Sequence, residues 1–162
     1  CSAHFVRDPT ALVRTLSVLP AYLQSREGGA VIDYRDWGVP LGRRFRALKL
    51  WAVLRCYGKA GLQERIREHV RLASLFERWV RAEPGWEVVA PRHFSLVCFR
   101  RRGTDEENER LLERVNDSGE VFLSHARLGD RYALRLAVGS FRTTEDDVRL
   151  AWDVLRREAS AS

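Results

Sequence analysis

The sequence predicts a mixed α/β protein, in which a helical first part leads into a small α+β layer. Two observations predict it. Apolar residues recur with a helical period from Arg43 to Arg81, and after Pro84-Gly85 short β-branched and aromatic runs alternate with helix signals. Of the 162 residues, 45% are apolar and 31% are charged, which suffices for a hydrophobic core and excludes wholesale disorder. No run of about 18 uncharged apolar residues is present, so no bilayer-spanning segment is expected.

The first part is expected to be loop-rich and then helical. Residues 1–6 are consistent with a short strand that ends at the turn-prone pair Asp8-Pro9. Residues 20–30 contain Pro, two adjacent Gly and charged side chains, which is typical of a mobile surface loop, and Tyr22 stands out in it. A helix then follows Arg43. Its apolar face comprises Phe45, Leu48, Trp51 and Leu54.

A break is expected at residues 57–61, followed by a second helix over residues 62–81. The side chains expected to face inward are Leu62, Ile66, Val70, Ala73, Phe76 and Val80. Strands are predicted over 86–89, 94–100, 121–126 and 131–138. A capping box at Thr104–Glu107 begins one helix, and Thr143 or Thr144 caps the last. We place a domain boundary near residue 58.

The charge and the cysteines limit the functional classes. The formal charge is +6, and Lys49 and Lys59 are the only lysines. The three cysteines, Cys1, Cys56 and Cys98, form no CxxC pair, so neither a zinc site nor a disulfide framework is indicated, and a reducing cytoplasmic compartment is expected. The four histidines lack metal-ligand spacing, so no metal site is expected.

The residues alone leave the function open. Arg43, Arg44 and Arg46 follow Gly42 and are consistent with an anion site at a helix start or with a solvated helix face. Taken by themselves, the residues indicate only a mobile loop that carries Tyr22 beside this helix start. Two other classes stay open as alternatives, an Arg-rich nucleic-acid-binding domain and a non-catalytic dimerisation module.

A long run resembles a known family. The run DYRDWGVPLGRRFRALKLWAVLRCYGKAGLQERIREHV is similar to the aromatic-L-amino-acid decarboxylases, which are group II decarboxylases dependent on pyridoxal 5'-phosphate (PLP). The resemblance continues through LVCFR, RVN and YALRLAVGSFRTTEDDV, and upstream through CSAHFV and PAYLQ. It covers essentially the whole chain.

The resemblance implies a fold-type I PLP-dependent transferase-like α/β enzyme that forms a homodimer. Residues 1–58 would be the C-terminal part of the large PLP-binding domain with the catalytic loop, and residues 59–162 the small α+β domain. Neither nucleic acid nor a membrane is then expected as a partner. The substrate would be an aromatic L-amino acid of the dopa or tryptophan type, converted to the amine and CO2.

The resemblance also implies roles for four residues. Tyr22 matches the loop tyrosine that returns a proton to the substrate carbon after CO2 leaves, which suits a phenol that stays protonated at neutral pH. Gly42 and Leu41 match positions that line the pocket for the substrate ring, in the same subunit or its partner. The missing side chain at Gly42 leaves room for a bulky ring. Arg35 matches an arginine near the base of the loop, either an anchor or a contact of the substrate carboxylate, and we favour the anchor.

No cofactor-binding residue is expected within the chain. In the family the cofactor lies on a lysine that follows a histidine, and neither Lys49 nor Lys59 has such a neighbour. Because the chain begins at Cys1 rather than Met, we expect a fragment, with the cofactor lysine upstream of Cys1. The fragment alone is then expected to be inactive, because positioning the cofactor is the protein's main task.

Overall fold

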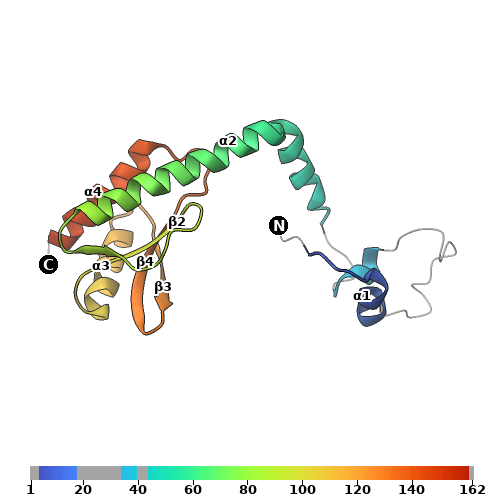
Figure 1. The fold of residues 1–162 in the computed structure, drawn as a ribbon, viewed down its shortest axis with the longest axis horizontal. Coiled ribbons are helices and arrows are strands. Elements are labelled where there is room, and N and C mark those ends of the chain that lie inside the picture. Colours follow the sequence, from blue (N-terminus) through green and yellow to red (C-terminus); the bar gives the residue numbers. More distant parts are fainter. Residues whose placement is uncertain (1–3, 18–33, 40–43, 161–162) are drawn as a thin grey trace. The chain divides into compact units, whose positions relative to one another are not determined.

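The computed structural model describes residues 4–17, 34–39 and 44–160. The chain divides into two compact units, Cys1–Gly58 (unit 1) and Lys59–Ser162 (unit 2). Each unit is described by itself. Figure 1 shows helices and a small sheet gathered into layers in unit 2.

Unit 1 contains helix α1 (Pro9–Leu16), the 3-10 helix η2 (Tyr34–Trp37) and the start of α2 (Ala47–Ala82). The expected strand over residues 1–6 is wrong for the described residues 4–6, which form none. The expected turn at Asp8-Pro9 is instead a helix start. Oδ1 of Asp8 accepts a hydrogen bond from the Thr10 amide at 2.9 Å, and Pro9 lies in the first turn, where its missing N–H needs no partner.

Helix α2 is interrupted at Gly58, whose backbone is not helical (φ 61°, ψ −179°). The expected break in this region is therefore confirmed, and it falls on a residue that adopts positive φ without a Cβ clash. The flanking segments differ from expectation in their limits. The first begins at Ala47 rather than Arg43, and the second continues directly after Gly58 rather than beginning at Leu62.

Part of the expected inward face of α2 is buried in unit 2. Ala73, Phe76 and Val80 of the expected face are buried, and so is Leu72, which was not part of it. Leu62 and Val70 are half-buried, and Ile66 is 54% exposed. Ile66 lies about two turns before Ala73, and Figure 1 shows α2 continuing past the layer that it covers. The helical period therefore identifies much of the buried face, but not how far along the helix that face is covered.

The sheet of unit 2 has four strands, β1 (Trp86–Val88), β2 (Leu96–Arg101), β3 (Ser124–Leu128) and β4 (Arg131–Ala137). Their order is β1-β2-β4-β3, and all neighbours are antiparallel. Leu128 pairs with Arg131 across a two-residue turn, which confirms the turn expected at Gly129-Asp130. Strand β2 begins later than expected, because Phe94 has a left-handed backbone (φ 51°) that interrupts strand geometry.

The two remaining helices, α3 (Asp105–Asp117) and α4 (Glu145–Ser160), begin where local signals predict. Thr104 and Glu107 form the expected capping box, with the Thr104 amide donating to Oε2 of Glu107 at 2.8 Å. Of the two candidates for the last cap, Thr144 is the one used. Its amide donates to Oδ2 of Asp147 at 2.8 Å, and the Asp147 amide donates to its hydroxyl at 3.3 Å.

The hydrophobic core lies in unit 2, between the sheet and helices α2, α3 and α4. Its centre is aromatic. The ring of Phe76 on α2 meets Phe99 on β2 at a centroid distance of 5.0 Å and Trp152 on α4 at 5.6 Å, both edge to face. Trp86 on β1 contacts Trp152 at 5.2 Å. By contrast, no described residue of unit 1 is buried.

Candidate functional site

Three of the four candidate site residues, Tyr22, Leu41 and Gly42, lie outside the described residues. Arg35 lies within η2. The described part of the chain therefore does not bring these four residues together, and their roles stay predictions.

The structure describes a contact between the end of α1 and η2. The hydroxyl of Ser17, which follows α1, donates to Oδ1 of Asp36 in η2 at 3.3 Å, and Tyr34 and Trp37 bring their rings within 6.1 Å. The residues that flank the segment over 18–33 are thus joined, and Arg35 belongs to the same turn as Asp36. The anchoring role expected of Arg35 stays a prediction.

The start of α2 bears on the possible anion site. Arg44 and Arg46 are exposed, the Arg46 amide donates to the Arg44 carbonyl at 2.7 Å, and the helix begins only at Ala47. Arg43 lies outside the described residues. Both described arginines are exposed and directly precede the first helical turn, which is consistent with a solvated basic segment and with an anion site alike.

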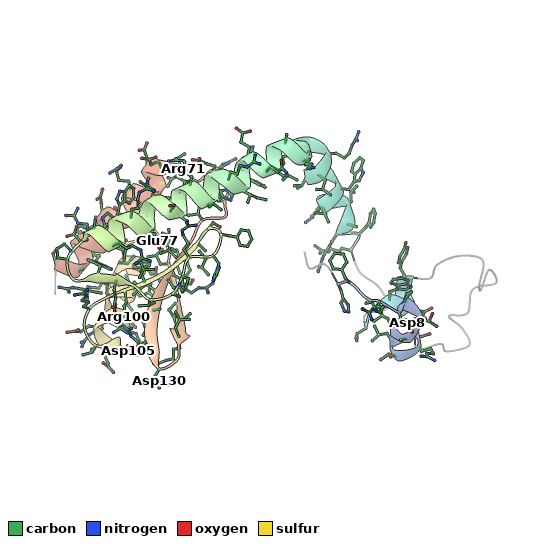
Figure 2. The ribbon with its side chains drawn as sticks, viewed as in Figure 1. Asp8, Arg71, Glu77, Arg100, Asp105 and Asp130 are labelled. Atoms are coloured by element: carbon green, nitrogen blue, oxygen red, sulfur yellow. The ribbon has the colours of Figure 1, made fainter. Side chains whose placement is uncertain are left out.

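A buried polar network in unit 2 was not anticipated from the sequence. Arg100 on β2 is only 4% exposed, and it donates to Oδ1 of Asp105 at 2.7 Å. It also donates to the carbonyl oxygens of Gly103 and Tyr132, at 2.6 and 3.0 Å. Figure 2 shows Arg100 and Asp105 side by side. The network joins the end of β2, the start of α3 and β4, so its role is structural.

Asp105 is the second centre of this network. Its Oδ2 accepts the Tyr132 amide at 3.0 Å and lies 3.6 Å from the guanidinium of Arg127. The hydrogen bond from Arg100, followed by that from the Tyr132 amide, holds the pKa of the Asp105 carboxyl below its usual value. Beside it, the side chain of buried Asn108 makes two hydrogen bonds with the backbone of Arg101. The Arg101 amide donates to Oδ1 of Asn108 at 2.8 Å, and Nδ2 of Asn108 donates to the Arg101 carbonyl at 3.0 Å.

The lowered pKa of Asp105 predicts how the stability of unit 2 changes as the pH falls. A carboxyl whose pKa is lower in the folded state stabilises the fold above its unfolded pKa, about 3.9, and loses that contribution as the pH falls through the folded value. We expect Asp105→Asn to lower the melting temperature at neutral pH and to reduce its decline on acidification. Circular dichroism melts between about pH 7 and pH 3 measure both.

Asp153→Asn is the matched control for this prediction, because Asp153 is an exposed aspartate on α4. Its acid profile should match that of the unmodified chain. Identical profiles for Asp105→Asn and the unmodified chain would contradict the assignment.

The surface of unit 2 has hollows among its described residues. One, of about 430 Å³, is lined by both signs of charge, including Glu83, Asp153, Arg101 and Arg157. Another, of about 280 Å³, is lined by Arg101, Glu107, Arg110, Leu111 and Arg114. No lysine lines either hollow. Among the residues that the structure describes, no group of His, Cys, Asp or Glu could hold a metal ion.

Comparison with known proteins decides the family. Residues 1–102 match the model of the pyridoxal-dependent decarboxylase conserved domain. The chain belongs to the pyridoxal-dependent decarboxylase family. The resemblance seen in the sequence and the fold class that it implies are therefore confirmed, and the cofactor of the family is pyridoxal phosphate.

Individual relatives are similar in sequence to nearly the whole of this chain. Tyrosine decarboxylase 1 of Narcissus pseudonarcissus and tryptophan decarboxylase TDC2 of Camptotheca acuminata are each 43% identical over 99% of this chain. Phenylacetaldehyde synthase of Arabidopsis thaliana is 44% identical over the same share. The chain spans 34% of the length of each of these relatives.

Solved structures show the same likeness in three dimensions. A crystal structure of Oryza sativa TDC with PLP and tryptamine has a TM-score of 0.87 and 43% identity, covering 96% of this chain and 34% of that one. Catharanthus roseus tryptophan decarboxylase in complex with L-tryptophan has a TM-score of 0.83 and 40% identity, covering 97% of this chain and 33% of that one.

The described residues of this family member do not by themselves fit the cofactor. A lysine that carries pyridoxal phosphate needs a pocket with partners for the phosphate and the ring nitrogen. Lys49 and Lys59, the only lysines of the chain, are both exposed on α2.

No helix in the described parts is long and apolar enough to cross a membrane.

Proposed function

We propose that this chain is the C-terminal third of an enzyme that decarboxylates an aromatic L-amino acid with pyridoxal phosphate, yielding the amine and CO2. The observation that carries the proposal is the likeness to the Oryza sativa structure with PLP and tryptamine over 96% of the chain. The named relatives include tyrosine and tryptophan decarboxylases, which supports an aromatic substrate class.

The proposal divides the work between two domains. Residues 1–58 close the large domain and carry the catalytic loop, and residues 59–162 form the small α+β domain. The cofactor lysine lies in a part of the polypeptide outside residues 1–162, which agrees with the exposed positions of Lys49 and Lys59. The enzyme acts as a cytoplasmic homodimer in which Leu41 and Gly42 line the pocket of one subunit or the other.

The roles of this chain's own residues follow from their chemistry. Tyr22 donates its phenolic proton to the substrate carbon once CO2 has left, because a phenol still carries its proton at neutral pH. Closure of the loop that carries Tyr22 excludes water from the reacting carbon. Gly42 leaves space for an indole or catechol ring, and Arg35 anchors the base of the loop.

An aldehyde synthase is a second candidate, because one relative is named phenylacetaldehyde synthase and a solved neighbour, at 37% identity, is 4-hydroxyphenylacetaldehyde synthase from Rhodiola rosea. Tyr22 favours the decarboxylase, because a tyrosine that protonates the carbon from which CO2 has left gives the amine rather than the aldehyde as product.

The proposed function is tested on the full-length polypeptide loaded with pyridoxal phosphate. L-Tryptophan, L-dopa, L-tyrosine and L-histidine are supplied separately, and amine, aldehyde and CO2 are measured for each. We expect amine and CO2 in equal amounts, with L-tryptophan or L-dopa preferred. Absence of CO2 release from every aromatic amino acid contradicts the proposal, and aldehyde as the main product supports the second candidate.

A further inference from the structure

Strand β3 lies at one edge of the four-stranded sheet (Figure 1), because the strand order is β1-β2-β4-β3. It has five residues, against three in β1 at the opposite edge, and all of them except Ala126 are exposed. An edge strand presents backbone N–H and C=O groups that can pair with a further strand. Of the two edges of this sheet, β3 is therefore the longer one at which a further strand can add.

The register of β3 against β4 shows which backbone groups face outward. Counted from the two-residue turn, every second pair is hydrogen-bonded, which makes these pairs Leu128–Arg131, Ala126–Ala133 and Ser124–Arg135. On β4, the Tyr132 amide donates to Asp105 and the Tyr132 carbonyl accepts from Arg100, so this intervening residue faces away from β3, as the alternation requires. On β3, the intervening residues are His125 and Arg127, and their backbone groups point away from β4.

The chain itself satisfies the same outward groups one step before β3. The amide of Leu123 donates to Oδ1 of Asn116 at 2.9 Å, and the Leu123 carbonyl accepts from Nδ2 of Asn116 at 3.1 Å. The Asn116 side chain thus pairs with Leu123 as a neighbouring strand would. Among the residues that the structure describes, none pairs in this way with the backbone of His125 or Arg127.

The charge of this edge indicates what kind of strand it accepts. Residues 121–137 carry three arginines and one acid, which are Arg127, Arg131, Arg135 and Asp130. The side chain of Arg127 is 64% exposed and lies 3.6 Å from Asp105, which is longer than a hydrogen bond. Opposite charges on neighbouring strands are stabilising, and like charges directly opposite are destabilising. A strand with carboxylates therefore fits better than a second copy of β3, which would bring arginines together.

We propose that β3 binds an extended, acidic segment of another protein by strand addition. The backbone groups of His125 and Arg127 form the new ladder, and carboxylates of the segment pair with the Arg127 guanidinium. The ring of Phe122, which is 83% exposed just before the strand, offers an apolar contact at one end of the segment. The inference is independent of the proposed function, because none of these residues is assigned to catalysis or to substrate binding.

The test measures peptide binding to the full-length polypeptide loaded with pyridoxal phosphate, by fluorescence anisotropy. The probe is a labelled peptide of about seven residues in which valine and glutamate alternate, the length of an ordinary strand. One control peptide has the same sequence with its backbone nitrogens methylated, so it cannot donate to a ladder. The other has lysine in place of glutamate. We expect the acidic peptide to bind at least roughly tenfold more tightly than either control.

Variants of the protein locate the binding to β3. His125→Pro removes one outward N–H, and proline is tolerated on an edge strand where that N–H faces solvent. His125→Val is the matched control, because it keeps the N–H but loses the same imidazole, which stacks on Tyr132 at 5.0 Å. We expect His125→Pro to weaken binding of the acidic peptide at least roughly tenfold and His125→Val to change it less than about twofold. Should His125→Pro lower the melting temperature, the methylated peptide still tests the ladder on the unmodified protein.

Several results overturn the inference. Equal binding of the acidic and methylated peptides contradicts strand addition, and equal binding of the acidic and lysine peptides contradicts an acidic partner. Absence of binding of the acidic peptide up to about 1 mM shows that Arg127 only protects the edge from association. Larger oligomers of the enzyme that His125→Pro abolishes show that the occupant is a second copy. The release of CO2 bears on none of these results, so the proposed function stands or fails separately.

Discussion

Full-length enzyme carrying Tyr22→Phe is expected to release CO2 at a rate within a few fold of the unmodified enzyme while its amine formation falls by roughly 10²–10⁴-fold. Without the phenolic proton, the substrate carbon left after CO2 loss reacts instead with dioxygen. The balanced products are aldehyde, ammonia and hydrogen peroxide, with one O2 and one water consumed for each CO2 released.

Amine and aldehyde are separated by chromatography, and dioxygen uptake is followed with an electrode. Tyr34→Phe is the matched control, because Tyr34 is an exposed tyrosine of η2 outside the 18–33 segment, 75% accessible to solvent. It should leave the amine as the product. Unchanged amine output from Tyr22→Phe excludes Tyr22 as the proton donor.

The second large effect is expected on stability. Arg100→Met removes the buried guanidinium and leaves the carbonyls of Gly103 and Tyr132 without the hydrogen bonds that it donates. Breaking such a buried network by removing one partner lowers the free energy of unfolding by about 3 kcal/mol or more. For a domain the size of unit 2, the melting temperature should fall by roughly 12 °C or more.

Two further variants test the cause of that loss. Arg127→Met removes the other arginine near Asp105, but this side chain is 64% exposed and 3.6 Å away, so we expect a loss below about 1 kcal/mol. Arg100→Lys keeps the charge and lacks the planar fork, so it should recover little of the stability. Equal losses from Arg100→Met and Arg127→Met in thermal melts of the 162-residue chain would show that the network is not the cause.

The sequence predicts those parts of the fold that are specified locally. The caps at Thr104 and Thr144, the break at Gly58 and the turn at Gly129-Asp130 each depend on a few neighbouring residues, and all four are present. Helix α1 escaped prediction because Asp8-Pro9 is equally typical of a turn and of a helix start, and only the following residues decide between them.

Features that depend on distant contacts could not be predicted in this way. Arg100 follows a buried strand residue and is expected to be solvated, yet contacts from α3 and β4 bury it. The sequence predicts Asp105 only as part of a helix cap. The arginines at the end of β2, directly before the start of α3, were the available signal for its ion pair. The exposure of Ile66 depends on how far along the helix other elements cover α2, and the helical period carries no information on that.

The candidate site depends on resemblance rather than on residue chemistry. Tyr22 and Gly42 carry no local pattern that distinguishes a catalytic loop from an ordinary one, and the family comparison supplies the context. Their placement within the active site stays a prediction, because both lie outside the described residues.

The most direct test of this account asks which lysine carries the cofactor. The full-length polypeptide and the 162-residue chain are each incubated with pyridoxal phosphate and reduced with borohydride, and the modified lysine is located by mass spectrometry. We expect stoichiometric modification of the full-length polypeptide at a single lysine outside residues 1–162, and none of the 162-residue chain above that of a denatured control. Stoichiometric modification at Lys49 or Lys59 would contradict the account.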